Sequence, residues 1–278
     1  MTFLTRMAEA SLARVRAARA NESEAALERR ALALPAPPAL RLDGFDVIAE
    51  LKLRSPAAGG LARDGFDAQM QLASYARGGA AAISVLTEPT EFRGELAHLA
   101  DAARTLGAQR PAMRKDFLTE PYQVLEARAA GAGGVLVILA MLDDSTVRAL
   151  VDCAQRCGMF VLLEAFDRAD LERLAAYDVP HSAGRPRILA GVNCRDLRDL
   201  KVRFERFAEI APHLPQHLPT VAESGIGNAA DIGVVVGAGY DLALVGSALM
   251  QAPEPATALA ELIAAGRAAV AGRQARCS

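Results

Sequence analysis

The sequence predicts an α/β fold: a (β/α)8 barrel, or TIM barrel, with an N-terminal helical extension. Short apolar runs recur about every 20 to 35 residues from Phe45 onward, and helical patterns lie between them. Eight such runs fit into about 230 residues with no second linker, which favours a closed barrel over an open doubly wound sheet. We therefore expect a single domain over residues 1–278, with the extension at 1–44 and the barrel at 45–278.

The extension is expected to be helical from residue 3 to about residue 34. Its first part carries one apolar stripe, formed by Leu4, Met7, Leu12 and Val15. Residues 20–23 predict a break with a new N-cap, and Pro35–Pro38 then ends the helix because proline lacks a backbone donor. We expect this extension to pack against or over the barrel.

Each predicted strand is a short run of strand-forming residues bounded by turn or helix signals. The eight runs are Asp46–Lys52, Ala81–Thr87, Pro111–Phe117, Gly134–Ala140, Met159–Glu164, Ile188–Asn193, Thr220–Ser224 and Asp241–Gly246. The helical patterns include Asp67–Arg77, Glu120–Ala130, Ser145–Cys157, Arg168–Ala176, Asn228–Val236 and a final Ala-rich helix from about Glu254 to Val270. A short extra helix is expected to begin within Gly246–Met250.

Composition places the chain among globular proteins. It has 278 residues, of which 52% are hydrophobic and 23% charged, and its formal net charge is −2. Near-neutral charge gives no reason to expect nucleic acid or an anionic membrane as a partner. The longest apolar run, about Gly131 to Leu142, is shorter than a membrane-spanning helix needs, and the charged, amphipathic N-terminus is unlike a signal peptide. We therefore expect a cytoplasmic protein.

The sequence gives no metal signal. The four cysteines lack the C-x2-C spacing of zinc sites, so free thiols in a reducing compartment are expected. They are Cys153, Cys157, Cys194 and Cys277. The four histidines are scattered away from the predicted strand ends, and none pairs with a carboxylate at metal-ligand spacing.

Ionisable residues gather at the C-terminal ends of the predicted strands, where barrels of this kind hold their chemistry. The first run ends with Glu50 and Lys52, which lie two apart and so project to one face of the strand. Other runs end with Lys115, Glu164 and Glu223. Confinement lowers the pKa of a lysine and raises that of a carboxyl, while opposite charges offset both shifts. We predict an acid–base centre; a structural ion-pair network and, for either lysine, a Schiff base remain alternatives.

The last two strand ends predict a phosphate site. Gly225 and Gly227 precede one helical pattern, and Gly246 and Ser247 precede another. Backbone N–H groups exposed by glycine at a helix start bind anions, and barrels often use these two loops for phosphate. The G-x-G-x-x-A pattern in 225–230 also matches a dinucleotide loop, but here it follows the seventh strand rather than opening the sheet. Plain turn glycines are the remaining alternative.

Arg195, beside Asn193 after the sixth run, offers a planar guanidinium for a substrate carboxylate. A salt bridge to Asp196 or Asp199 is the structural alternative.

Phe92 follows the second run and Phe117 ends the third, and both are placed to sandwich an aromatic substrate. Packing of these rings at the barrel rim is an equally good interpretation.

Taken together, these residues resemble the indole-3-glycerol-phosphate synthase family, with matches in order from about residue 45 to 252. The matching segments are Ile48–Pro56, Ser84–Thr87, Lys115–Phe117, Pro121–Gln123, Gly191–Leu197, Ala222–Gly225 and Val245–Met250. The resemblance implies a (β/α)8 carboxy-lyase of tryptophan biosynthesis that needs no cofactor. Its implied substrate is 1-(2-carboxyphenylamino)-1-deoxyribulose 5-phosphate, which undergoes ring closure, decarboxylation and dehydration.

The resemblance also implies roles for the ionisable residues. Lys115 would be the general acid that activates the substrate carbonyl, and Glu164 would act as general base or acid in the dehydration. Lys52 would assist proton transfer and hold the substrate, Glu50 would orient the lysines, and Glu223 would support the site. Asn193 is grouped with these catalytic residues and would also bind the substrate. The implied substrate-binding residues are Ser55, Pro56, Phe92, Phe117, Arg195 and Ser224, and the implied phosphate-binding residues are Gly225, Gly246 and Ser247.

The chain departs from the family pattern at three positions. The family usually has a basic residue where Leu53 stands, Ser where Ala57 stands and Asn where Cys194 stands. None of these changes removes an acid or a base. They leave open a homologue that acts on a modified substrate in a specialised pathway.

Two other interpretations differ in class. A phosphoribosylanthranilate isomerase would need a Cys or Asp base near the first strand end, where this chain has Glu-x-Lys, and a catalytically silent binding protein would show decayed strand ends. As partners we expect a phosphorylated small molecule and no nucleic acid or membrane. The chain is expected to be a monomer or weak homo-oligomer, with association with other tryptophan-pathway enzymes left open.

Overall fold

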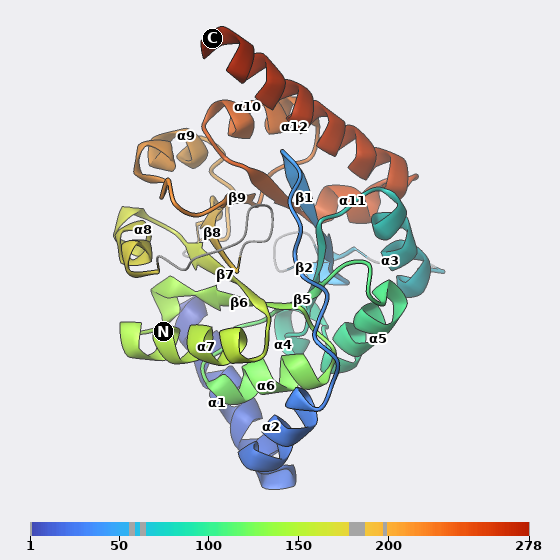
Figure 1. Ribbon diagram of the computed structural model, residues 1–278, viewed down its shortest axis with the longest axis vertical. Coiled ribbons are helices and arrows are strands. Elements are labelled where there is room, and N and C mark those ends of the chain that lie inside the picture. The colour runs from blue at the N-terminus through green and yellow to red at the C-terminus, as the bar shows by residue number, and fades with distance from the viewer. Residues whose placement is uncertain (1, 56–58, 62–64, 178–186, 197–198, 278) are drawn as a thin grey trace.

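Eight parallel strands close into a barrel, which confirms the predicted fold class (Figure 1). The computed structural model describes residues 2–55, 59–61, 65–177, 187–196 and 199–277, without the side chains at 55, 274, 276 and 277. Around the barrel the strand order is β1-β10-β9-β8-β7-β6-β5-β4. Each strand begins and ends within two residues of a predicted run: β1 (Asp46–Leu51), β4 (Ala82–Leu86), β5 (Ala112–Lys115), β6 (Gly134–Ile138), β7 (Phe160–Ala165), β8 (Ile188–Asn193), β9 (Thr220–Glu223) and β10 (Leu242–Val245).

Helices cover the outside of the barrel (Figure 1). They are α3 (Ala68–Arg77), α4 (Pro89–Phe92), α5 (Leu96–Leu106), α6 (Pro121–Ala129), α7 (Asp144–Arg156), α8 (Arg168–Arg173), α9 (Arg206–Ile210), α10 (Ala229–Gly237), α11 (Ser247–Gln251) and α12 (Pro255–Cys277), with 3-10 turns η1 (Leu139–Met141), η2 (Leu174–Ala176) and η3 (Ala211–His213). The expected short extra helix is α11. Three helices, α4, α5 and α9, lie outside those that the sequence pattern predicts. A two-stranded antiparallel sheet, β2 (Arg54–Ser55) with β3 (Gly59–Gly60), follows β1.

The N-terminal extension forms two helices, α1 (Phe3–Asn21) and α2 (Glu24–Leu32), with the break where the sequence predicts it. The Ser23 side chain caps α2 by accepting a backbone N–H of its first turn. The extension lies beside α6 (Figure 1), where Gln123 Nε2 donates to Ser11 Oγ at 2.8 Å. The extension therefore packs against the barrel helices, as expected.

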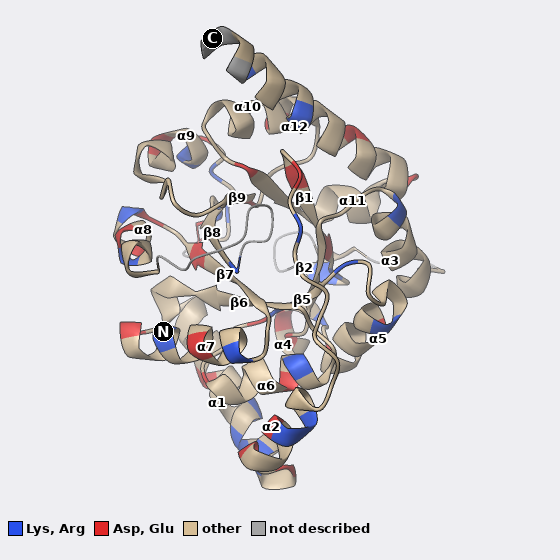
Figure 2. Ribbon diagram, in the orientation of Figure 1, with Lys and Arg blue, Asp and Glu red and all other residues tan. Residues whose placement is uncertain are grey.

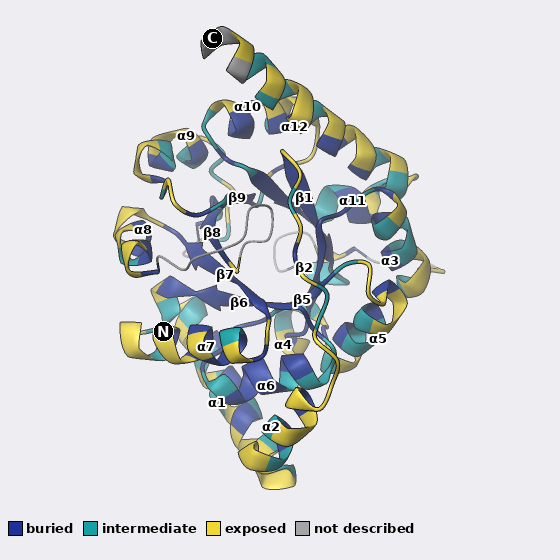
Figure 3. Ribbon diagram, in the orientation of Figure 1, coloured by how far each residue is buried: buried dark blue, intermediate teal, exposed yellow. Residues whose placement is uncertain are grey.

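Two apolar layers hold the fold together. Side chains that point into the barrel form one cluster, which includes Ile48, Met113, Leu162 and Val221. A larger cluster lies between the strands and the surrounding helices. Figure 3 shows buried strands inside helices whose outer faces are exposed. Because apolar side chains fill the barrel interior, the polar residues at the C-terminal strand ends lie together at one rim of the barrel. Within the described ranges, no helix combines the length and apolar character that crossing a bilayer requires.

The last helix packs tightly on the barrel at Gly266. A Cβ at this position would lie 2.0 Å from the buried ring of Phe45, whereas a Cβ at Gly233 in α10 meets nothing within 4 Å. We expect Gly266→Ala to lower the free energy of unfolding by about 1–3 kcal/mol despite its better helix propensity. Gly233→Ala, the matched control, should raise it by about 0.5–1 kcal/mol. Urea unfolding measures both, and equal effects of the two substitutions would refute the close packing.

Candidate active site

One cavity of about 420 Å³ opens at the C-terminal ends of the barrel strands. Most of the residues that the sequence predicts for the site line it, namely Glu50, Lys52, Phe92, Lys115, Phe117, Glu164, Asn193, Arg195, Glu223, Ser224, Gly225, Gly246 and Ser247. Figure 2 shows acidic positions on β1, β7 and β9 around the barrel centre. Pro56 lies outside the described residues, as do Ala57 and the Ser55 side chain.

Glu50 and Lys52 form an ion pair at the end of β1. Lys52 Nζ lies 2.7 Å from Glu50 Oε1, and Glu50 is buried. Burial alone would raise the pKa of the Glu50 carboxyl, but attraction to Lys52 and Lys115 outweighs it and holds that pKa below its usual value. Glu50 is therefore an anion that pairs directly with Lys52 and attracts Lys115 through its charge.

Lys115 reaches from β5 to two carboxyls on other strands. Its Nζ lies 3.3 Å from Glu164 Oε2 on β7 and 3.1 Å from Glu223 Oε2 on β9. Burial works to lower the pKa of this amine, but the surrounding carboxylates raise it above its ordinary value. Lys115 is thus an ammonium at neutral pH. A Schiff-base nucleophile needs a neutral amine, so this protonation weighs against the aldolase-like alternative.

The pKa of the Glu223 carboxyl shifts in the opposite direction from that of Glu50. Burial raises the pKa of the Glu223 carboxyl to about 8, and the charge of Glu164 adds to the rise while Lys115 opposes it. One of its oxygens, Oε1, is buried without a hydrogen-bond partner among the described residues. A neutral acid tolerates this position better than an anion does. The Lys115–Glu164–Glu223 group therefore holds two transferable protons at neutral pH.

Asn193 joins the glutamates to the neighbouring loops. Its Nδ2 donates to Glu164 Oε2 at 3.2 Å, which leaves its Oδ1 to accept from the Arg195 backbone N–H at 3.0 Å and from Ser224 Oγ at 2.9 Å. The amide thereby fixes both the orientation of Glu164 and the start of the loop after β8.

Arg195 lines the cavity, and its NH1 donates to the backbone carbonyl of Leu200 at 2.6 Å. The two aspartates that were the alternative salt-bridge partners of Arg195 both form ion pairs with Arg203, Asp196 at 3.3 Å and Asp199 at 2.8 Å. A guanidinium has five donors, so the bond to one carbonyl leaves Arg195 with donors for a ligand.

The loops after β9 and β10 approach the ion pair closely. A Cβ at Gly246 would lie 2.4 Å from Glu50 Oε1, so a larger residue would displace the carboxylate. Gly225 has φ +78°, a left-handed conformation that glycine adopts without strain. The N–H of Gly227 is already bonded to Asp231 Oδ2 at 2.8 Å. Because the pattern at 225–230 follows the seventh barrel strand, the dinucleotide alternative lacks its structural context.

Aromatic rings form the opposite wall. The Phe92 and Phe117 centroids lie 6.3 Å apart at an interplanar angle of 39°. Phe3, from the first turn of α1, packs edge-on against Phe117 at 5.8 Å and lines the cavity with Leu4. Sequence reasoning missed Phe3 and Leu4 as site residues. The only signal was an apolar pair at the start of an extension expected to pack over the barrel.

Cys194 departs from the family pattern without adding a reactive group. Its thiol is buried and contacts the Ser224 carbonyl at 3.3 Å, and burial raises its pKa to about 11. Cys153, Cys157 and Cys194 are all free thiols. Within the parts of the chain that the structure describes, no three His, Cys, Asp or Glu side chains gather as metal ligands would.

Comparison with known proteins places the chain. A family model described as "Indole-3-glycerol phosphate synthase" matches residues 4–262. The chain belongs to this family. Relatives named indole-3-glycerol phosphate synthase include those of Parafrankia sp. (44% identical, 88% of each chain), Mycolicibacterium smegmatis (42%, 86% of each) and Mycobacterium tuberculosis (40%, 95% of each).

Among solved structures, the barrel resembles KGPDC from Streptococcus mutans and 3-hexulose-6-phosphate synthase from Salmonella typhimurium. The TM-scores are 0.60 and 0.59, the identities 8% and 14%, and the alignments cover 81% and 80% of this chain and 99% and 98% of the other. At such low identity these similarities show the fold alone. The indole-3-glycerol phosphate synthase family supplies the closer relationship.

The raised pKa of Glu223 predicts a pH-dependent stability. The folded-state value is about 8 against a reference of 4.5, so its contribution is full below pH 4.5 and is lost as pH rises to 8. The Glu223→Gln side chain does not ionise, so the stability of this variant does not fall with pH for this reason. We expect its stability relative to the wild type to increase by roughly 4 kcal/mol between pH 5 and pH 8.5. Chemical unfolding at the two pH values measures it, and a pH-independent difference would show that Glu223 is ionised throughout.

Proposed function

We propose that this cavity carries out the ring closure, decarboxylation and dehydration of 1-(2-carboxyphenylamino)-1-deoxyribulose 5-phosphate to indole-3-glycerol phosphate. The enzyme is a carboxy-lyase of tryptophan biosynthesis. The observation that carries the proposal is the Lys115 ammonium, which lines the cavity between Glu164 and Glu223 and is 15% exposed. It supplies a proton donor and two carboxyls in the same cavity as the phenylalanine rings and the glycine loops.

The substrate would lie across the barrel mouth. β5 and β9 are four strands apart in the closed ring of eight, so the aromatic wall faces the glycine loops. The substrate's ring would contact Phe92 and Phe117, and its phosphate would bind at Gly225, Gly246 and Ser247. A loop N–H group and the start of a helix both favour an anion there.

The polar residues between these ends would hold the rest of the substrate. Arg195 would bind the ring carboxylate through its remaining donors, while Asn193, Ser55 and Ser224 would bind hydroxyl groups. Pro56 would complete the loop over the substrate.

Ring closure needs an acid at the ketone oxygen. The ring carbon that bears the carboxylate attacks the carbonyl carbon, a carbon–carbon bond forms, and the oxygen takes a proton from Lys115 as its charge develops. An ammonium with a raised pKa still protonates this oxygen, because an alkoxide is far more basic than any amine. Loss of CO2 then breaks the bond to the ring carbon and returns its electron pair to the ring. Glu223, held in its acid form, accepts a hydrogen bond from Lys115 at 3.1 Å.

Dehydration needs a second acid and a base. Glu164 would first take up a proton from within the Lys115–Glu164–Glu223 group and give it to the hydroxyl that leaves as water. It would then take up the proton released from carbon as the pyrrole double bond forms. Asn193 holds Glu164 in position at 3.2 Å. Lys52 would assist proton transfer and hold the substrate, and Glu50 keeps both amines oriented.

The whole chain is proposed to work as one unit, with the extension at 1–44 completing the site of the barrel at 45–278. We further propose that it acts in the cytoplasm as a monomer or weak homo-oligomer. Association with other enzymes of tryptophan biosynthesis is compatible with this arrangement.

Turnover of the carboxyphenylamino-deoxyribulose phosphate tests the function, and Lys115→Met tests the acid. The wild type should release CO2 and form a fluorescent indole. Lys115→Met should lower kcat by about 10²–10⁴-fold, because the positioned proton donor is gone, while circular dichroism shows a retained fold.

Lys201→Met is the matched control, since this exposed lysine lies outside the catalytic group, and its kcat should stay near wild type. An inactive wild-type enzyme at high concentration would overturn the function. A Lys115→Met enzyme with near-wild-type kcat would overturn only the role of Lys115.

A further inference from the structure

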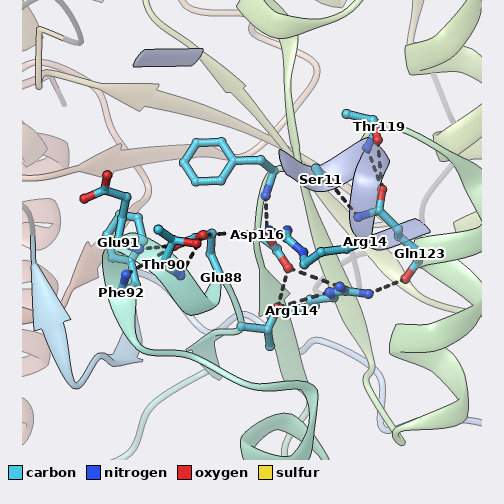
Figure 4. Close-up of polar contacts among 12 residues, drawn as sticks. Ser11, Arg14, Glu88, Thr90, Glu91, Phe92, Arg114, Asp116, Thr119 and Gln123 are labelled. Atoms are coloured by element: carbon cyan, nitrogen blue, oxygen red, sulfur yellow. Dashed lines mark hydrogen bonds and ion pairs between the residues drawn. The ribbon is translucent and has the colours of Figure 1, made fainter. Parts of the chain in front are cut away.

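Two carboxylates lie directly behind the aromatic wall. Glu88 follows β4 and is fully buried; its side chain accepts backbone N–H groups from Thr90 at 2.9 Å, Glu91 at 2.7 Å and Phe92 at 3.2 Å (Figure 4). These bonds cap α4, a helix of only four residues that ends at Phe92. So short a helix has little stability of its own, so the Glu88 cap determines where the Phe92 ring lies.

Asp116 does the same for the second ring. It follows Lys115 directly, and its Oδ1 accepts the Phe117 N–H at 2.8 Å. Its Oδ2 accepts from Thr87 Oγ1 at 2.8 Å and from Arg114 at 3.1 Å. Burial would raise the pKa of Asp116, but Arg114 and Arg14 lower it below the usual value. The turn that joins Lys115 to Phe117 therefore depends on a charged Asp116.

One guanidinium joins the two carboxylates. Arg14 of α1 lies 2.7 Å from Asp116 Oδ1 and 3.7 Å from Glu88 Oε1, and both carboxylate side chains are 0% exposed (Figure 4). Arg14 itself is 28% exposed and points inward from the extension. Asp116 keeps Arg114 as a second cation, whereas Arg14 is the one cation that an ion pair places within 4 Å of Glu88 among the described residues.

The extension does not need Arg14 in order to stay docked. Ser11 accepts from Gln123, Tyr122 donates to the Glu22 carbonyl at 3.0 Å, and Arg19 pairs with Glu120. An Arg14 substitution therefore tests the contact to the two carboxylates rather than the attachment of α1.

We propose that Arg14 is a positioning residue for the aromatic half of the substrate, acting through Glu88 on Phe92 and through Asp116 on Phe117. The inference rests on the proposed function, because it assigns the substrate's ring to this wall. It makes the N-terminal extension part of the substrate site through a residue that never touches the substrate.

Separate titrations of the two halves of the substrate test the proposal. The probes are 2-aminobenzoate for the aromatic half and inorganic phosphate for the other. In Arg14→Ala, the dissociation constant for 2-aminobenzoate should rise about tenfold and that for phosphate should stay within about twofold, because the phosphate loops lie across the barrel. Arg14→Lys keeps the positive charge but loses the planar guanidinium donors. Its dissociation constant for 2-aminobenzoate should therefore rise by an intermediate amount, about threefold.

Steady-state kinetics give the second readout. Arg14→Ala should raise KM about tenfold with kcat lowered less than about threefold, whereas a loss of folded enzyme would lower kcat at constant KM. Arg16→Ala is the matched control, an exposed arginine on the same helix, and should leave both constants unchanged. If Arg14→Ala does not fold, Arg14→Lys supplies the same comparison.

Three results would overturn the proposal: unchanged 2-aminobenzoate affinity, equal weakening of phosphate, or a fall in kcat without a rise in KM. A wild-type enzyme without turnover would overturn the proposed function instead, and the 2-aminobenzoate titration would still decide the role of Arg14.

Discussion

The reactive end of this barrel depends on one largely buried ammonium. Lys115 Nζ lies 3.3 Å from Glu164 and 3.1 Å from Glu223, and these carboxyls come from strands that only barrel closure brings together. A single charge at this depth would cost several kcal/mol, so neither the amine nor Glu164 would be tolerated there alone. The neighbouring Glu50 and Lys52 side chains likewise offset each other's charge. The groups proposed for proton transfer are therefore also the groups that make one another's burial tolerable, and removing one changes the protonation of the rest.

In the proposed function, the walls of the cavity recognise different parts of the substrate around this centre. Glycine loops after β9 and β10 leave backbone groups accessible on one side, and phenylalanine rings from α1, α4 and the end of β5 face them. The extension thus contributes in two ways, with Phe3 in the cavity and Arg14 behind it. A helix that precedes the barrel in sequence therefore lines the cavity at the strand ends.

Much of this arrangement could be predicted from the sequence, because strand patterns are local and barrels place chemistry at strand ends. Glu50, Lys52, Lys115, Glu164 and Glu223 all follow from that rule. The rest depends on contacts between distant segments. No local pattern shows that Phe3 reaches the cavity. Nor does one show that Arg14 contacts Glu88 and Asp116, which follow it by 74 and 102 residues. The direction of the Lys115 pKa shift likewise needs the distances to two carboxyls, since burial and charge act in opposite directions.

The protonation of Lys115 is the most direct test of this account. The chain has three lysines, Lys52, Lys115 and Lys201, so a protein labelled with ¹⁵N-lysine gives three side-chain signals that single substitutions assign. We expect the Lys115 ammonium to keep its proton at pH values above the ordinary lysine pKa of about 10.4. A Lys115 amine that loses its proton below that pH would contradict the claim that the surrounding carboxyls hold this group as the acid.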